Sequence, residues 1–167
     1  KCPLFTSERV GLAKASAVFR GEERTLPELL AYFANIGSED AFRRMCVLDA
    51  VILNTDRHYG NFGVLFDTDT LEIQSMAPVF DHNRSLLPEL DNDQLSQPGW
   101  YLKRCRPRLG RDFLLNARGL LTASIRNDLK RLEGFQFQQH PIIHAEQERL
   151  DALSSIVREQ VRLILAD

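Results

Sequence analysis

The chain has few cysteines and no long apolar run. Its three cysteines, Cys2, Cys46 and Cys105, are odd in number and far apart, which argues against a secreted disulfide scaffold. We expect reduced thiols and a cytoplasmic protein. No apolar stretch approaches the roughly 18 residues that a membrane span needs, because polar residues such as Asp49 and Asn54 interrupt the candidates. We therefore expect no membrane association.

Charge of one sign and several common enzyme motifs are also absent. The net charge of −2 provides no overall basic field, which argues against direct nucleic-acid binding. No Walker loop, dinucleotide-binding fingerprint or Gly-x-Ser-x-Gly motif occurs. With 44% hydrophobic and 26% charged residues, the 167 residues predict one globular domain. The chain starts at Lys1 without Met or a signal peptide, so we expect it to be a C-terminal piece of a longer protein.

The first half of the sequence contains two well-marked helices. Residues 1–24 have weak periodicity, and we expect them to be irregular with some helix over 10–17. Thr25 with Glu28 three residues later predicts a capped helix that Gly37 ends. Ser38 predicts the N-cap of a second helix, whose apolar residues recur at helical spacing from Phe42 to about residue 53.

A hairpin and further helices follow. Residues 62–66 and 71–75 predict two strands around a turn at 67–70, and a short apolar stretch at 76–80 leads into Asp81. We expect residues 82–110 to be mostly irregular. Helices are predicted over 112–121, from Ser124 to Glu133, and from His144 to Leu165. The predicted fold class is mainly α (α+β), a helical bundle with a small β-hairpin that carries polar loops.

The polar residues after the second helix have a spacing with chemical meaning. Asp56 and Asn61 stand at the D-x-x-x-x-N interval of a protein-kinase catalytic loop, and Asp81 follows the hairpin. Such a set needs one carboxylate to orient an attacking hydroxyl, and an amide oxygen and a second carboxylate to hold Mg²⁺. Because the two loops flank strands of one small ribbon, we expect them to converge.

The stretches LNTDRHYGNFGVLFD (53–67) and MAPVFDHNRSLL (76–87) resemble the C-terminal lobe of HipA-like serine/threonine kinases. The resemblance covers roughly residues 40–90 and implies a bacterial, Mg²⁺- and ATP-dependent kinase, in a family founded by the toxin of a toxin–antitoxin pair. It implies that Asp56 is the catalytic base and that Asn61 and Asp81 bind Mg²⁺. We also predict that His58 belongs to the cofactor-binding site. We expect it to hold the loop by a hydrogen bond rather than to act as a base.

The sequence also departs from the kinase pattern. Asp81 is followed by His82 instead of Phe-Gly, so a Phe-based switch is not expected. No Gly-rich hairpin precedes Asp56, and the upstream lysines, Lys1 and Lys14, lie in no convincing strand. We therefore expect the N-terminal nucleotide lobe to be absent from this chain, and residues 1–167 predict a single domain, the catalytic lobe.

Two further interpretations stay open beside the kinase. The chain could be a catalytically inactive, kinase-like binding module, or a metal-dependent phosphohydrolase that uses the same carboxylates with water. For the kinase, the expected partners are ATP and a protein with a Ser or Thr acceptor, with an antitoxin-like protein as a further candidate. Arg57 fits a surface ion pair and a contact with a loop or the substrate equally well. The basic run from Lys103 to Arg111 predicts a solvated segment that could contact an acidic partner, a phosphorylated residue or nucleic acid.

Overall fold

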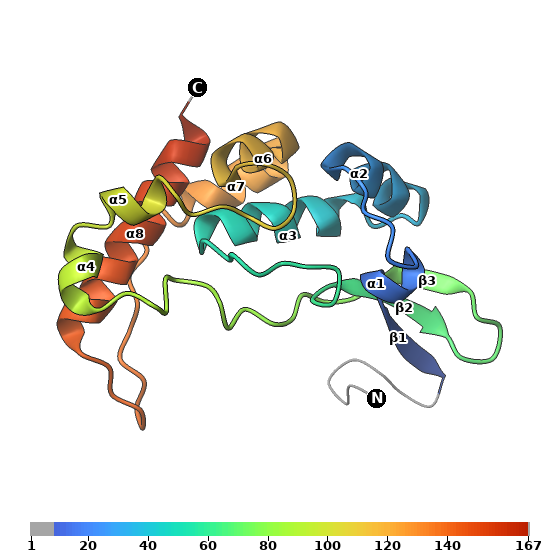
Figure 1. Cartoon of the computed structure of the whole chain (residues 1–167), viewed down its shortest axis with the longest axis horizontal. Helices are drawn as coiled ribbons and strands as arrows, with labels where there is room; N and C mark the ends of the chain where they lie inside the picture. The colour runs from blue at the N-terminus through green and yellow to red at the C-terminus, as the bar shows by residue number, and fades with distance from the viewer. Residues whose placement is uncertain (1–8, 167) are drawn as a thin grey trace.

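The computed structural model describes residues 9–166, and Figure 1 shows a small sheet at one end and most of the helices towards the other. The sheet has the order β1-β2-β3 with antiparallel pairing throughout. The fold is therefore mixed α/β, with eight helices and three strands among the described residues. The elements are β1 (Val10–Lys14), α1 (Ala15–Val18), α2 (Leu26–Asn35), α3 (Glu39–Val51), β2 (Gly63–Asp67), β3 (Ile73–Met76), α4 (Asn92–Ser96), α5 (Gly99–Leu102), α6 (Phe113–Leu120), α7 (Ala123–Lys130) and α8 (Gln147–Leu165).

The predicted hairpin is confirmed as β2 and β3, each displaced by one or two residues from its expected position. Its turn depends on Asp67, whose Oδ1 accepts hydrogen bonds from the backbone N–H groups of Asp69 and Thr70. These bonds replace ladder bonds where the chain reverses, and they lower the pKa of Asp67. The hairpin positions the two polar loops at its open end.

The expectation for residues 10–17 was wrong, because most of this segment is a strand. β1 pairs with β2 in a register that joins Lys14 to Gly63, so Lys14 ends a strand after all. The two backbones approach so closely there that a Cβ on Gly63 would lie 2.1 Å from the carbonyl oxygen of Ala13. Only glycine fits at this position. The helix that follows, α1, is a single turn.

Helices α2 and α3 begin where the sequence predicts, although by different means. The backbone N–H of Thr25 donates to Glu28 Oε2 at 2.7 Å, the capping box expected for α2. Ser38 precedes α3 but makes no side-chain cap. Its Oγ instead accepts from the backbone N–H of Met76 at 2.9 Å, which ties the start of α3 to the end of β3.

The C-terminal helices follow the predicted order with corrected ends. Asp112 caps α6 by accepting from the backbone of Leu114 and Leu115. α7 is capped by Thr122 rather than Ser124. α8 begins at Gln147, three residues later than expected. The segment expected to be mostly irregular, 82–110, contains the short helices α4 and α5.

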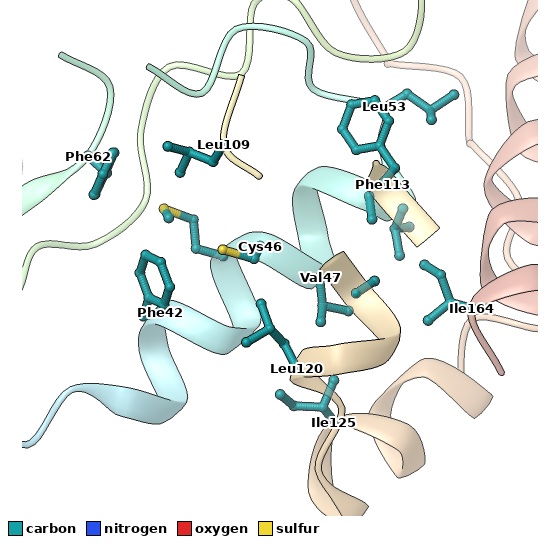
Figure 2. Packing of buried hydrophobic residues seen from close by; sticks show 14 of the residues in the cluster. Phe42, Cys46, Val47, Leu53, Phe62, Leu109, Phe113, Leu120, Ile125 and Ile164 are labelled. Atoms are coloured by element: carbon teal, nitrogen blue, oxygen red, sulfur yellow. The ribbon is translucent and has the colours of Figure 1, made fainter. Parts of the chain in front are cut away.

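The hydrophobic core surrounds α3, which packs against α2, α6 and α8 (Figures 1 and 2). At its sheet end, the rings of Phe33 and Phe42 stack with centroids 4.8 Å apart. Cys46 and Cys105 are buried free thiols, and burial raises the pKa of both, to about 11 for Cys105. Cys2 lies outside the described residues. Figure 2 labels core residues from α3 to α8: Phe42, Cys46, Val47, Leu53, Phe62, Leu109, Phe113, Leu120, Ile125 and Ile164.

Among residues 9–166, every helix is too short or too polar to cross a lipid bilayer.

Replacing Ser38 with Ala should lower the free energy of unfolding by about 1–3 kcal/mol, because the buried N–H of Met76 loses its acceptor. Urea unfolding measures this. The matched control is Ser124→Ala, which removes an exposed hydroxyl and should cost less than about 0.5 kcal/mol. Equal losses in the two variants would contradict the role assigned to Ser38.

Candidate active site

The first polar loop begins with a buried asparagine that shapes it. Asn54 is fully buried, and its Nδ2 donates to Asp49 Oδ1 at 3.0 Å. Its Oδ1 accepts from the backbone N–H of Asp56 at 3.1 Å. The side chain therefore replaces backbone partners in a tight turn after α3, and this turn fixes the direction in which Asp56 leaves the core.

Arg57 lies in the centre of the site, where it makes the expected contact with a loop but not the expected surface ion pair. It is 1% exposed and binds Asp49 with two nitrogens, Nε to Oδ2 at 2.9 Å and Nη2 to Oδ1 at 2.8 Å. Its Nη1 donates to two backbone oxygens, that of Asn61 at 2.7 Å and that of Phe80 at 2.6 Å. One guanidinium thus joins the two polar loops, as the sequence predicted they would converge.

The side chains of Asn61 and Asp81 each have an oxygen atom that accepts no hydrogen bond from residues 9–166. Asn61 is buried, and its Nδ2 donates to the backbone oxygen of Asp56 at 3.0 Å, which leaves Oδ1 as the free acceptor. Asp81 is exposed, directly follows Phe80, and its carboxylate has no hydrogen bond or ion pair within residues 9–166. Amide and carboxylate oxygens are hard ligands of the kind that Mg²⁺ prefers. Larger clusters, with three or more His, Cys, Asp or Glu side chains, are not found in the described part of the chain.

The carboxylate of Asp56 is 30% exposed and has a basic neighbour that sequence reasoning missed. Arg108 Nε lies 3.1 Å from Asp56 Oδ1. Arg108 belongs to the basic run 103–111, and spacing alone offers no signal that its side chain would reach Asp56. On the other side, His58 Nε2 lies 3.9 Å from Asp56 Oδ2.

His58 holds its own loop, as expected. Its Nδ1 accepts from the backbone N–H of Gly60 at 2.9 Å. The ring lies so close to Gly60 that a Cβ there would lie 2.7 Å from the ring carbon Cε1. The glycine and the histidine therefore form one tight turn that carries the chain from Asp56 to Asn61. A cofactor-binding role for His58 stays a prediction.

The N-terminal segment supports the same loop from outside. The backbone N–H of Ala15 donates to Phe62 at 2.9 Å, and that of Ser16 donates to Tyr59 at 2.8 Å. The hydroxyl of Tyr59 in turn accepts from the backbone N–H of Arg24 at 2.8 Å. These contacts join residues about 40 positions apart in sequence, and the weak periodicity of residues 1–24 gave no sign of them.

His82 follows Asp81 in place of the usual phenylalanine. Its Nε2 is buried and has no hydrogen-bond partner within residues 9–166. Burial lowers the pKa of His82, and the positive charge of Arg57 lowers it further, so the ring is neutral near pH 7.

Backbone strain gathers around the site. Leu53, Asp81, Leu86 and Leu87 all have positive φ, between 52° and 60°. This left-handed region is unfavourable for residues other than glycine, and above all for bulky ones. The backbone N–H of Leu86 donates to the oxygen of Ile52 at 2.7 Å. Because Ile52 precedes Leu53, this bond brings the strained residues of the two segments close together. Strain of this kind is concentrated at functional sites.

An apolar groove of about 710 Å³ lies elsewhere, along α3 and α7, with Met76 at its edge. It includes none of Asp56, Asn61 and Asp81, and the charged residues in its lining include Arg44 and Asp128, which pair with each other. The groove is therefore separate from the predicted site residues.

Comparison with solved structures finds a kinase. The fold is similar to that in the crystal structure of a Helicobacter pylori proinflammatory kinase, CtkA, with a TM-score of 0.62. The match covers 96% of this chain and 72% of that chain, at 18% sequence identity. At this identity the likeness shows a kinase-like fold and no more. Neither a protein-family model nor a curated protein matches the sequence.

Replacing Asp49 with Asn should lower the free energy of unfolding by about 3–5 kcal/mol, because Arg57 stays buried without a counter-charge. Urea unfolding measures the loss. The matched control is Asp40→Asn, which breaks an exposed pair with Arg44 and should cost at most about 1 kcal/mol.

A double variant, Asp49→Asn with Arg57→Met, tests the cause. It removes both charges, so part of the lost stability should return. If Asp49→Asn were no more harmful than Asp40→Asn, the central role of the buried pair would be refuted.

Proposed function

We propose that this chain transfers the γ-phosphoryl group of Mg²⁺·ATP to a Ser or Thr hydroxyl of a protein. The observation that carries the proposal is the guanidinium of Arg57, which binds the backbone of Asn61 and of Phe80 and so brings Asn61 and Asp81 together near Asp56. A kinase-like fold with these residues at its two polar loops supports this function over others.

Asp56 acts on the acceptor in this proposal. Its carboxylate is partly exposed, and the turn built by Asn54 sets its direction. It would orient the acceptor hydroxyl and accept its proton as the new bond to phosphorus forms. General-base help of this kind contributes about 10²- to 10⁴-fold to the rate. Arg108 would keep the carboxylate in position until an acceptor binds.

Asn61 and Asp81 would hold Mg²⁺. Their oxygens are hard donors without partners among residues 9–166, and two protein ligands suffice because Mg²⁺ keeps several waters. When bound, the ion would supply charge neutralisation for the phosphates of the nucleotide. The chain contributes the positions of both ligands, which the single guanidinium of Arg57 relates to each other.

The finer proposal is a HipA-like kinase, with residues 1–167 as its catalytic lobe. Asn54, Thr55 and Asp56 in place of His-Arg-Asp, and His58 two residues later, support it. The buried bonds of Asn54 give a physical reason for that replacement, because an asparagine can bridge Asp49 and the backbone of Asp56.

Replacing Asp56 with Asn should reduce phosphotransfer by at least about 100-fold, because the acceptor hydroxyl loses its base. Incorporation of radiolabel from [γ-³²P]ATP into the chain itself and into a degenerate Ser/Thr peptide library measures this. Asp69→Asn, in the exposed hairpin turn, is the matched control and should keep full activity. An unimpaired Asp56→Asn variant would refute the assignment.

Replacing Asp81 with Asn should weaken binding of Mg²⁺·ATP at least about tenfold in calorimetric titration, because one ligand loses its charge. ATP titrated with EDTA is the control, and the two proteins should then give the same weak heat. Absence of binding to the wild-type chain at millimolar nucleotide would contradict the proposal and favour a kinase-like binding module.

A further inference from the structure

A cleft of about 410 Å³ opens beside Asp56, on the side of Arg108. Its walls come from residues 55–56 and from the segments around 84–89 and 101–108, which follow Asp81 in the chain. Asn61 and Asp81 do not line it. The cleft is therefore distinct from the metal and phosphate side of the site, and Asp56 lies between the two. Its size is within the range of about 300–1,000 Å³ typical of ligand pockets.

The lining of this cleft is strongly basic. It includes the four arginines Arg84, Arg104, Arg106 and Arg108, against the two acidic residues Asp56 and Glu89. This local excess of positive charge contrasts with the chain's net charge of −2. Within residues 9–166, the guanidinium groups of Arg84 and Arg104 make no hydrogen bond or ion pair, whereas Arg106 binds the backbone oxygen of Cys105 at 2.8 Å.

The cleft thus offers two cations, Arg84 and Arg104, whose guanidinium groups bind nothing within residues 9–166. Arg84, Arg104 and Arg106 are exposed, and an exposed arginine fork pairs with a carboxylate through two parallel hydrogen bonds. Arg108 is also largely exposed and is held by the carboxylate of Asp56, which the proposed chemistry requires as the base. A second carboxylate entering the cleft would compete for Arg108 and would leave Asp56 free to meet a hydroxyl.

We propose that this cleft binds the protein acceptor and selects Ser or Thr residues flanked by Asp or Glu. This inference rests on the proposed function, because it takes Asp56 as the residue that meets the acceptor hydroxyl. An acceptor hydroxyl at Asp56 places the neighbouring residues of its chain in the cleft, beside the arginines. Their carboxylates then supply the counter-charges that the cleft lacks.

The shape and charge of the cleft favour an acidic peptide over a nucleic acid. The arginines are confined to one cleft instead of forming a long stripe, and Asp56 and Glu89 in the same walls would repel a phosphate backbone. Tyr101 is the sole aromatic residue that lines the cleft in the described part of the chain, too few for a series of stacked bases.

The test compares two fluorescent peptides that share a central serine and differ only in their flanks, Glu in one and Gln in the other. Fluorescence anisotropy without ATP should show that the chain binds the Glu peptide at least about tenfold more tightly, and that added salt weakens this binding. In the double variant Arg84→Gln with Arg104→Gln, the Kd for the Glu peptide should rise about five- to tenfold. Lys103→Gln is the matched control, because Lys103 is exposed in the same segment but does not line the cleft.

Two further readings separate this inference from the proposed function. Calorimetric affinity for Mg²⁺·ATP should be the same in the double variant and the wild type, since a loss would identify the arginines as phosphate ligands of the nucleotide and overturn the inference. Equal binding of the two peptides, or tighter binding of a single-stranded RNA than of the Glu peptide through the same arginines, would also overturn it. Selective binding of the Glu peptide without phosphotransfer would retain an acidic-peptide cleft and refute the kinase.

Discussion

The buried pair of Arg57 and Asp49 is the interaction on which the candidate site depends. Burying two charges is costly, and the cost is offset only where the geometry is good and the remaining donors find partners. Here the pairing is bidentate, Asn54 donates to the same carboxylate, and two backbone oxygens accept from the remaining nitrogen of the guanidinium. A hydrophobic pair could fill the same space, but it could not bind carbonyl groups from two different loops. The ion pair therefore fixes the positions of both loops relative to α3.

Several elements surround the pair and support the loops that it joins. α3 carries Asp49 at the centre of the core, the hairpin connects the two loops, and β1 with α1 binds the first loop from outside. α1, which follows β1, reaches the loop through backbone hydrogen bonds to Tyr59 and Phe62, so the side chains of Ala15 and Ser16 are not needed for these contacts. The segment after Asp81 is different. Its arginines lie on the surface, and Arg108 makes its contact with Asp56 through a side chain that is 61% exposed.

Local signals in the sequence were enough to predict much of the fold. The Thr25–Glu28 cap, the turn at 67–70 and the apolar face of α8 all depend on residues within a few positions of one another. What failed depended on distant partners. β1 is a strand because β2, some fifty residues later, pairs with it, and Arg57 is buried because Phe80 and Asp49 close around it. The spacing of Asp56, Asn61 and Asp81 indicated the two loops that Arg57 joins. No local pattern could predict that Arg108 lies beside Asp56, or that Ser38 accepts a hydrogen bond from the backbone of Met76.

The left-handed leucines connect the shape of the loops to the stability of the core. Leu53 and Leu87 are almost fully buried, and burying a leucine side chain contributes about 1.5–3 kcal/mol, more than the roughly 1–2 kcal/mol that an unfavourable φ costs. The burial of these two side chains therefore stabilises the unfavourable backbone conformation of the turns. A smaller side chain at either position would bury less apolar surface and would let the backbone relax to a negative φ. The packing of this part of the core and the positions of the polar loops therefore depend on each other.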